Sequence, residues 1–286
     1  MTQPASKRQR RKLKAHFGFS RIPFSKKMWA TTMFDSASQR ELLDGLHLWL
    51  EVRGLALVAG QGGVGKSITL RRFAAELDDA RFRVLDFTYL PSTVTGFFRS
   101  LCRKLGLPMR QHTTDLFDAA NDCLATFEQE QGAHPVVIID DADGLTAPVV
   151  DALRRLTAHE LDGEDRFSLL LSGTDDLLGL LRHPTLETLR SRFSYTQSLR
   201  PFALEDTRNY VRFHLERAEI DLKTFSDDAI KRLFSAAKGI PRNVNQLATQ
   251  ALIQAAVAGR DAIDGRLMTT IINAHPLYPG QQGGLS

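Results

Sequence analysis

The stretch VAGQGGVGKSITL, residues 58–70, constrains the fold more than any other part of this chain. It contains the pattern G-x-x-x-x-G-K-[ST], placed after a short apolar run and before a helix-like segment. Glycines let backbone N–H groups approach phosphates without a Cβ clash, and a helix N-terminus adds favourable dipole charge. The sequence therefore predicts a nucleotide site in a strand–loop–helix unit. Its predicted binding residues are Gly60, Gln61, Gly62, Gly63, Val64, Gly65, Lys66, Ser67 and Ile68.

A second segment, VVIIDDADGL, supplies the acidic groups that such a site needs. Lys66 would reach the β- and γ-phosphates of ATP, while Ser67 and Asp140 would hold Mg²⁺, Asp140 in part through water. Asp141 would face the γ-phosphate and orient the attacking water; as an alternative, it only caps the following loop. Two adjacent carboxylates beside a phosphate loop favour hydrolysis of ATP over binding alone.

Strand-like and helix-like segments alternate through the first two thirds of the chain. This alternation, together with the glycine loop, predicts an α/β fold with a P-loop parallel sheet sandwiched by helices, followed by a small helical domain. A continuously apolar run such as PVVIIDD is typical of a strand buried on both faces. The expected strands are residues 55–60, 82–90, 135–141, 167–173 and 193–199.

The predicted domain boundaries follow changes in composition. A basic disordered head covers residues 1–15, and residues 16–200 form the α/β nucleotide domain. That domain would begin with an ordered, aromatic-rich arm, HFGFSRIPFSKKMW. Residues 201–275 form the helical lid domain, and residues 276–286 form a loose tail.

The net charge of +4 comes mainly from the head, because without its six basic residues the chain would carry −2. Such a run can neutralise phosphates of duplex DNA largely independently of sequence, or it can serve as a solvated tail. A second basic segment, FFRSLCRKLGLPMR, either contacts DNA or forms an ordinary solvated helix face. The candidate DNA-binding residues are Lys7, Arg8, Arg10, Arg11, Lys12, Lys14, Arg99, Arg103, Lys104 and Arg110.

Other classes of protein are disfavoured by the sequence. No apolar run approaches the roughly 18 to 20 residues that span a bilayer, and the basic N-terminus lacks the apolar core of a signal peptide. Cys102 and Cys123 lack zinc-like spacing and are expected to be reduced core residues. We therefore expect a cytoplasmic protein without a membrane partner. No hydrolase or zinc-protease motif occurs, and a small-molecule kinase would not explain the helical C-terminal region.

Several segments in succession resemble AAA+ ATPases of the ExeA type, and the resemblance implies that the sheet is a P-loop AAA+ parallel sheet and that the helical region is its lid domain. They are residues 60–67, VVIIDDADGL, LLLSGTDDLLGLLRHPTLETLRSRF, LRPFALEDTRNYVRFHL and GIPRNVNQLATQAL, and the resemblance extends over roughly residues 16–274. Within that group, stand-alone members with a basic head are transposition helper ATPases, similar to TniB, TnsC and IstB. ExeA itself, which acts in secretion, is the alternative; it carries a membrane-spanning segment and a cell-wall-binding part that this sequence lacks.

The resemblance implies roles for further residues. Thr174 matches the position that senses the γ-phosphate, with Ser172 as a rival. Arg192 resembles the arginine finger that reaches a neighbouring subunit's nucleotide, with Arg190 as a rival and a plain surface arginine as the alternative. Arg242 matches the lid arginine called sensor two, or is only an arginine that begins a helix.

The resemblance also implies a mechanism. ATP bound between subunits would join them through Arg192 into a ring or helical filament on duplex DNA. The homo-oligomer would recruit a transposase, with or without a target-selection protein, and hydrolysis would disassemble it. Many AAA+ proteins have Glu where this chain has Asp141, so we expect slow hydrolysis. A secretion or envelope-assembly ATPase and a nucleotide-dependent signalling switch remain alternatives.

Overall fold

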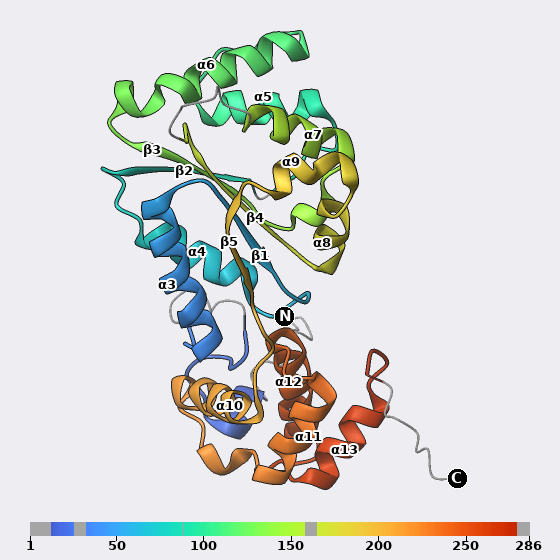
Figure 1. The fold of residues 1–286 in the computed structure, drawn as a ribbon. Coiled ribbons are helices and arrows are strands. Elements are labelled where there is room, and N and C mark those ends of the chain that lie inside the picture. The colour runs from blue at the N-terminus through green and yellow to red at the C-terminus, as the bar shows by residue number, and fades with distance from the viewer. Residues whose placement is uncertain (1–12, 26–32, 88, 158–164, 279–286) are drawn as a thin grey trace, which may run out of the picture. The chain divides into compact units, whose positions relative to one another are not determined.

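The computed structural model describes residues 13–25, 33–87, 89–157 and 165–278. Contacts between Cα atoms divide the chain into two compact units. One unit is residues 37–200, and the other combines residues up to 36 with residues from 201 onward. Figure 1 shows the two units.

The first unit is built on a five-stranded sheet in which every pairing is parallel. The strand order is β2-β3-β4-β1-β5. β1, β3 and β4 lie in the middle and are buried along their whole length, as their continuously apolar sequences predict. The edge strand β5 alternates between more and less exposed residues. The strands are β1 Leu55–Ala59, β2 Phe82–Phe87, β3 His134–Ile139, β4 Ser168–Gly173 and β5 Phe193–Ser198.

Helices cover both faces of this sheet (Figure 1). On one face, α3 and α4 contribute Leu46 and Phe73 to a core with Leu170. On the other face, the remaining helices pack over Leu169 and Leu171, because successive residues of a strand point to opposite faces. The helices of this unit are α3 Ala37–Val52, α4 Lys66–Glu76, α5 Val94–Lys104, α6 Thr113–Gln131, α7 Ala147–Leu156, α8 Asp175–Leu181 and α9 Glu187–Arg190.

The second unit is helical, as expected for residues after Pro201. Ser226 begins α11 by accepting a hydrogen bond from the Ala229 amide, and Pro241 is the first residue of α12, where its missing N–H costs nothing. Asp264 caps α13 in the same way as Ser226 caps α11. The helices are α10 Leu204–Ala218, α11 Asp227–Ala237, α12 Pro241–Val257 and α13 Gly265–Ala274.

The structure confirms the predicted fold class, with differences in detail. β2 ends at Phe87 and not at residue 90, and the short helices α8 and α9 were not anticipated. Such short helices depend on local caps, and α8 begins where Thr174 caps it. Within the described residues, no helix combines the length and the apolar character needed to cross a bilayer.

The aromatic arm is a correction to the predicted domains. We expected it in the α/β domain of residues 16–200, but Phe19 and Phe24 are buried in the core of the helical unit. The Ser20 amide donates to the carbonyl of Ala218, and the Phe24 ring lies 4.8 Å from that of His214. The arm's rings thus complete the core of the helical unit. Residues 13–17 are helical, so residues 13–15 are not part of a disordered head; residues 1–12 lie outside the described residues.

Candidate nucleotide site

The glycine loop between β1 and α4 has a backbone that only glycine adopts easily. Gly60, Gly63 and Gly65 have φ of 154°, 85° and 119°. A Cβ on Gly60 would lie 2.8 Å from the carbonyl oxygen of Leu199, whereas a Cβ on Gly62 would meet nothing within 4 Å. The loop is therefore fixed against the sheet at Gly60 and open toward the outside at Gly62.

The donors of this loop fit a chain of phosphates. In the described part of the chain, no acceptor contacts the amides of Gly62, Gly63 or Gly65. The Lys66 ammonium donates to the carbonyls of Gly60 at 2.7 Å and Gln61 at 3.3 Å, so it lies over the loop. These groups suit a bound phosphate chain, because amides and an ammonium at a helix N-terminus favour phosphate.

The acidic loop follows β3, which is separated from β1 in the sheet only by β4. Asp140 is half-buried and accepts a hydrogen bond of 3.0 Å from the Asp141 amide. Asp141 is exposed and has φ of 51°, an uncommon backbone conformation that Asp tolerates better than most residues. Among the described side chains, no three His, Cys, Asp or Glu residues form a metal site. Ser67 and Asp140 carry oxygens of the kind that Mg²⁺ takes, since this cation commonly binds one or two protein oxygens plus phosphates and water; their role as its ligands stays a prediction.

The end of β4 lies between these two loops. The hydroxyl of Thr174 accepts a hydrogen bond from the Asp176 amide at 3.4 Å and so caps α8. Its rival, Ser172, is fully buried, and its hydroxyl has no hydrogen-bond partner among the described residues. The sequence analysis missed Asp143, whose carboxylate accepts a hydrogen bond from the Thr174 amide at 3.0 Å. Nothing in the pattern DDADGL distinguishes this Asp from an ordinary turn residue.

The predicted arginines make contacts within the chain. Arg192 is half-buried and donates to the carbonyl of Thr157, the C-cap residue of α7. Arg190 is more exposed and donates to the carbonyl of Leu181 at 3.4 Å. Arg242 is exposed in the first turn of α12, in the helical unit. Their roles stay predictions.

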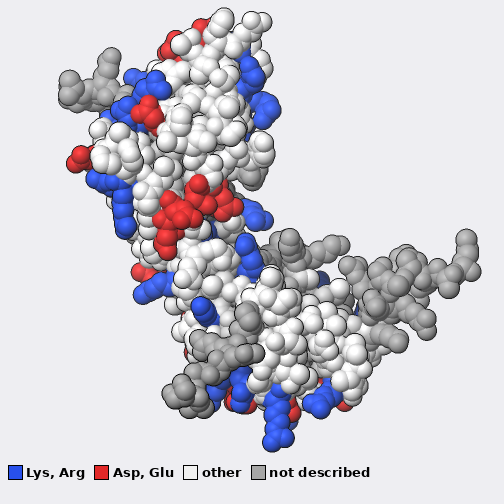
Figure 2. Space-filling view, turned by 90° about the vertical axis from the view of Figure 1, so that its right-hand side faces the viewer, with Lys and Arg blue, Asp and Glu red and all other residues white. Residues whose placement is uncertain are grey.

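The candidate DNA-binding residues do not form one set. Arg99 and Arg103 are exposed one turn apart on α5, and Arg110 is exposed after it. The Lys104 ammonium instead lies 3.6 Å from Oδ1 of Asp86 and above the ring of Phe87. On the face in Figure 2, basic side chains are dispersed while acidic ones gather in a patch. Of the predicted head, Lys14 is exposed, and Lys7, Arg8, Arg10, Arg11 and Lys12 lie outside the described residues.

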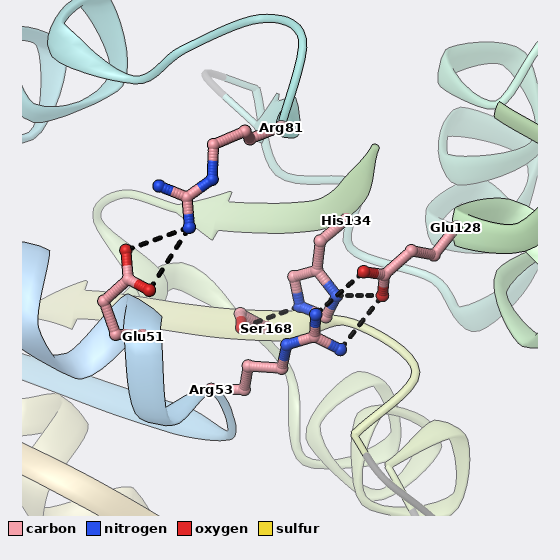
Figure 3. Close-up of polar contacts among 6 residues, drawn as sticks. All are labelled: Glu51, Arg53, Arg81, Glu128, His134 and Ser168. Carbon is pink, nitrogen blue, oxygen red and sulfur yellow. Dashed lines mark hydrogen bonds and ion pairs between the residues drawn. The ribbon is translucent and has the colours of Figure 1, made fainter. Parts of the chain in front are cut away.

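A second polar cluster lies at the opposite end of the strands, where they begin (Figure 3). Arg53 makes two hydrogen bonds to the carboxylate of Glu128, at 2.8 and 3.0 Å. His134 contacts the same carboxylate through Nδ1 at 3.1 Å and the hydroxyl of Ser168 through Nε2 at 3.0 Å. Burial lowers the pKa of His134 below its ordinary value, against the opposing effect of Glu128.

This cluster has the order of groups found in a Ser–His–acid triad. Ser168 is fully buried, however, so no substrate could reach its hydroxyl. We therefore interpret the cluster as structural. The sequence analysis missed it, because the residues are far apart in the chain and none belongs to a motif.

Comparison with known proteins places this geometry in a known class. Residues 50–181 match the family described as "AAA domain". The chain is 30% identical over 253 residues to General secretion pathway protein A of Aeromonas hydrophila. That match covers 86% of this chain and 45% of the relative, so the chain spans less than half the length of that protein.

Solved structures share the fold at lower identity. Cdc6p from Pyrobaculum aerophilum has a TM-score of 0.64 and 20% identity, with 85% of this chain and 69% of that chain covered. The Aeropyrum pernix ORC1 protein in complex with DNA has a TM-score of 0.59 and 18% identity, covering 82% and 63%. The AAA domain match also supports the predicted enzyme class, an ATP hydrolase. Residues 50–181 of this chain thus match the AAA domain family, and the chain shares the fold of Cdc6p and ORC1.

Proposed function

We propose that this protein binds ATP with Mg²⁺ at the glycine loop and hydrolyses it slowly. The observation that carries this proposal is the arrangement of donors and acids at one edge of the sheet. Amides of Gly62, Gly63 and Gly65 are available to phosphate, and the Lys66 ammonium lies over the loop. Asp140 and Asp141 follow directly after β3 in the same unit. These parts can hold a nucleotide and orient a water toward its γ-phosphate.

Phosphate release from ATP by the purified protein tests this activity, measured with and without Mg²⁺. The median turnover of enzymes is about 10 per second. We expect Mg²⁺-dependent turnover well below this value, because the Asp141 side chain is shorter than the Glu that many AAA+ proteins have at this position. Turnover of several tens per second in the presence of DNA would contradict the slow rate. Asp118→Ala removes one exposed carboxylate from α6 and serves as the control for variants that remove a carboxylate of the acidic loop.

We further propose that ATP joins subunits into a ring or filament on duplex DNA, and that this assembly recruits a transposase. Exposed Arg99 and Arg103 are suited to phosphate contacts. ORC1 of Aeropyrum pernix, which shares this fold, is in complex with DNA. In this proposal Arg192 would leave its contact with Thr157 and reach the nucleotide of a neighbouring subunit. The location would be cytoplasmic.

Negative-stain electron microscopy tests assembly, with duplex DNA and either ATP, a non-hydrolysable analogue or ADP. We expect rings or filaments on DNA with the triphosphates, and none with ADP or with Lys66→Ala. Arg99→Glu combined with Arg103→Glu should weaken retention on DNA and leave ATP hydrolysis without DNA intact. Particles that do not respond to DNA or nucleotide would contradict the proposal.

A second candidate is a role in secretion or envelope assembly. The observation that favours it is the 30% identity to General secretion pathway protein A, although the match covers only 45% of that protein. In that case nucleotide would still bind at the glycine loop, but assembly would not require DNA. The microscopy experiment therefore separates the two candidates.

A further inference from the structure

One peptide group connects the glycine loop to the acidic loop. The carbonyl oxygen of Gly173 accepts a hydrogen bond from the Gly60 amide at 3.1 Å. The next amide along the chain, that of Thr174, donates to the carboxylate of Asp143 at 3.0 Å. Because a peptide bond is planar, its C=O and N–H move together. The Gly173–Thr174 peptide thus bridges the first residue of the glycine loop and the loop that follows β3.

The packing around this peptide leaves it little freedom. A Cβ on Gly173 would lie 2.7 Å from Cβ of Leu177 and 2.8 Å from Oδ1 of Asp143. The carboxylate and α8 therefore pack directly against the backbone at this point. A displacement of Asp143 has to move this peptide or break its hydrogen bond.

Asp143 and Asp141 belong to the same tight turn. Ala142–Gly144 form one turn of 3₁₀ helix, and the Gly144 amide donates to the carbonyl of Asp141 at 3.0 Å. Asp141 precedes this turn with a left-handed backbone, φ 51°. Only Ala142 separates the two aspartates, so a displacement of the Asp143 backbone also moves the backbone at Asp141.

We propose that Asp143 is a positioning residue for ATP hydrolysis, which holds the Asp141 turn in place relative to the glycine loop through the Gly173–Thr174 peptide. This inference rests on the proposed function. In it, Asp143 does not contact the nucleotide; its carboxylate acts as a hydrogen-bond acceptor for the Thr174 amide. Misplacement of a water-orienting group affects the chemical step more than binding, because phosphate contacts stay in place.

Two variants of Asp143 separate its hydrogen bond from its charge. Asp143→Asn keeps an oxygen acceptor and should retain kcat within about threefold, whereas Asp143→Ala should lose at least about tenfold. For both variants, the affinity for ATP should stay within about threefold, measured with a fluorescent ATP analogue. Asp118→Ala on α6, which removes an exposed carboxylate, should match the wild type. In hydrogen exchange, the Thr174 amide should exchange faster in Asp143→Ala than in Asp143→Asn.

Each outcome decides between the alternatives. Unchanged kcat in Asp143→Ala would overturn the inference, and so would equal loss in the Asn and Ala variants or a fall in ATP affinity as large as the fall in kcat. If Asp143→Ala does not fold, Asp143→Ser, which is too short to reach the amide, takes its place with the same expected values. No turnover by the wild type would instead overturn the proposed function, and this inference with it.

Discussion

The two ends of the strands in this sheet differ in whether their polar groups are paired, as two serines of β4 show. Ser168 and Ser172 are both fully buried, and each lies near one end of the same strand. The hydroxyl of Ser168 has a partner 3.0 Å away in His134, whereas the hydroxyl of Ser172 has none within the part of the chain that the structure describes. The same residue type is thus paired where the strand begins and unpaired where it ends.

This difference extends to the neighbours of each serine. At the edge where strands begin, Arg53, Glu128 and His134 satisfy one another. At the other end, where strands stop, the amides of Gly62, Gly63 and Gly65 have no acceptor in the described residues, and Asp141 has a left-handed backbone. In parallel sheets, ligands bind at the carboxyl ends of the strands, so a nucleotide bound there would supply acceptors to these amides.

The largest effect should come from Lys66→Ala. The variant removes the charge that faces the phosphates, and we expect ATP affinity to fall more than about 100-fold, in keeping with the strength of charge-assisted hydrogen bonds. Unfolding by heat gives the measurement: ATP should raise the Tm of the wild type and leave that of the variant unchanged. An equal rise in Tm of both proteins with ATP would contradict this expectation, because nucleotide would then not bind at the carboxyl ends of the strands.

Asp141→Asn should separate binding from chemistry at the same edge. Asn also tolerates a positive φ, so the turn should form, but the side chain can no longer take a proton from water. We expect kcat to fall by about 10² or more while ATP affinity is retained. Single-turnover phosphate release measures the first quantity and titration the second. A variant as active as the wild type would leave Asp141 only its role in shaping the loop.

What could be predicted from the sequence depended on how far apart the interacting residues are. The glycine loop and Asp140 were located because each belongs to a short motif with a fixed place at a strand end. The Asp143–Thr174 contact joins residues 31 positions apart, and the pattern around Asp143 gave no sign of it. His134 was missed for the same reason, since its partner Ser168 begins another strand, 34 positions along the chain. Arg53, which pairs with the same Glu128 carboxylate, comes before a third strand.

The arm shows the same limit at the level of domains. Its aromatic residues predicted order but could not indicate which core they complete, and Phe19 and Phe24 lie in that of the helical unit. Periodicity within a segment predicts which face is buried. It does not say against what.

The two serines themselves provide a test on stability. Ser168→Ala removes a paired hydroxyl and leaves His134 with an unpaired buried nitrogen, so the free energy of unfolding should fall by about 1–3 kcal/mol. Ser172→Ala removes an unpaired hydroxyl and should leave this free energy unchanged or slightly higher. Urea unfolding of the two variants gives the comparison, with kcat of Ser168→Ala expected at the wild-type value. Equal destabilisation would mean that the two edges do not differ in this way.

The smallest expected effect is a dependence of stability on pH through His134. Burial holds its pKa below the ordinary 6.5, with the Glu128 carboxylate opposing. In the neutral ring, Nδ1–H donates to Glu128 and Nε2 accepts from Ser168, an assignment that follows from the hydrogen bonds. A group whose pKa is lowered by folding stabilises the protein fully above its unfolded pKa. This contribution is lost as the pH falls from about 6.5 through the folded value.

His134→Gln should therefore flatten the fall in unfolding free energy between about pH 7 and pH 5. The variant is less stable at neutral pH, but the slope is the quantity that identifies the titrating group. His214, whose pKa is lowered to about 4 by burial, contributes equally to both proteins and cancels in the difference. Urea unfolding at half-unit steps of pH measures that difference. If the two proteins showed the same dependence of unfolding free energy on pH, His134 would not change its protonation on unfolding. The polar cluster where the strands begin would then stabilise the fold through its hydrogen bonds without a contribution from this titration.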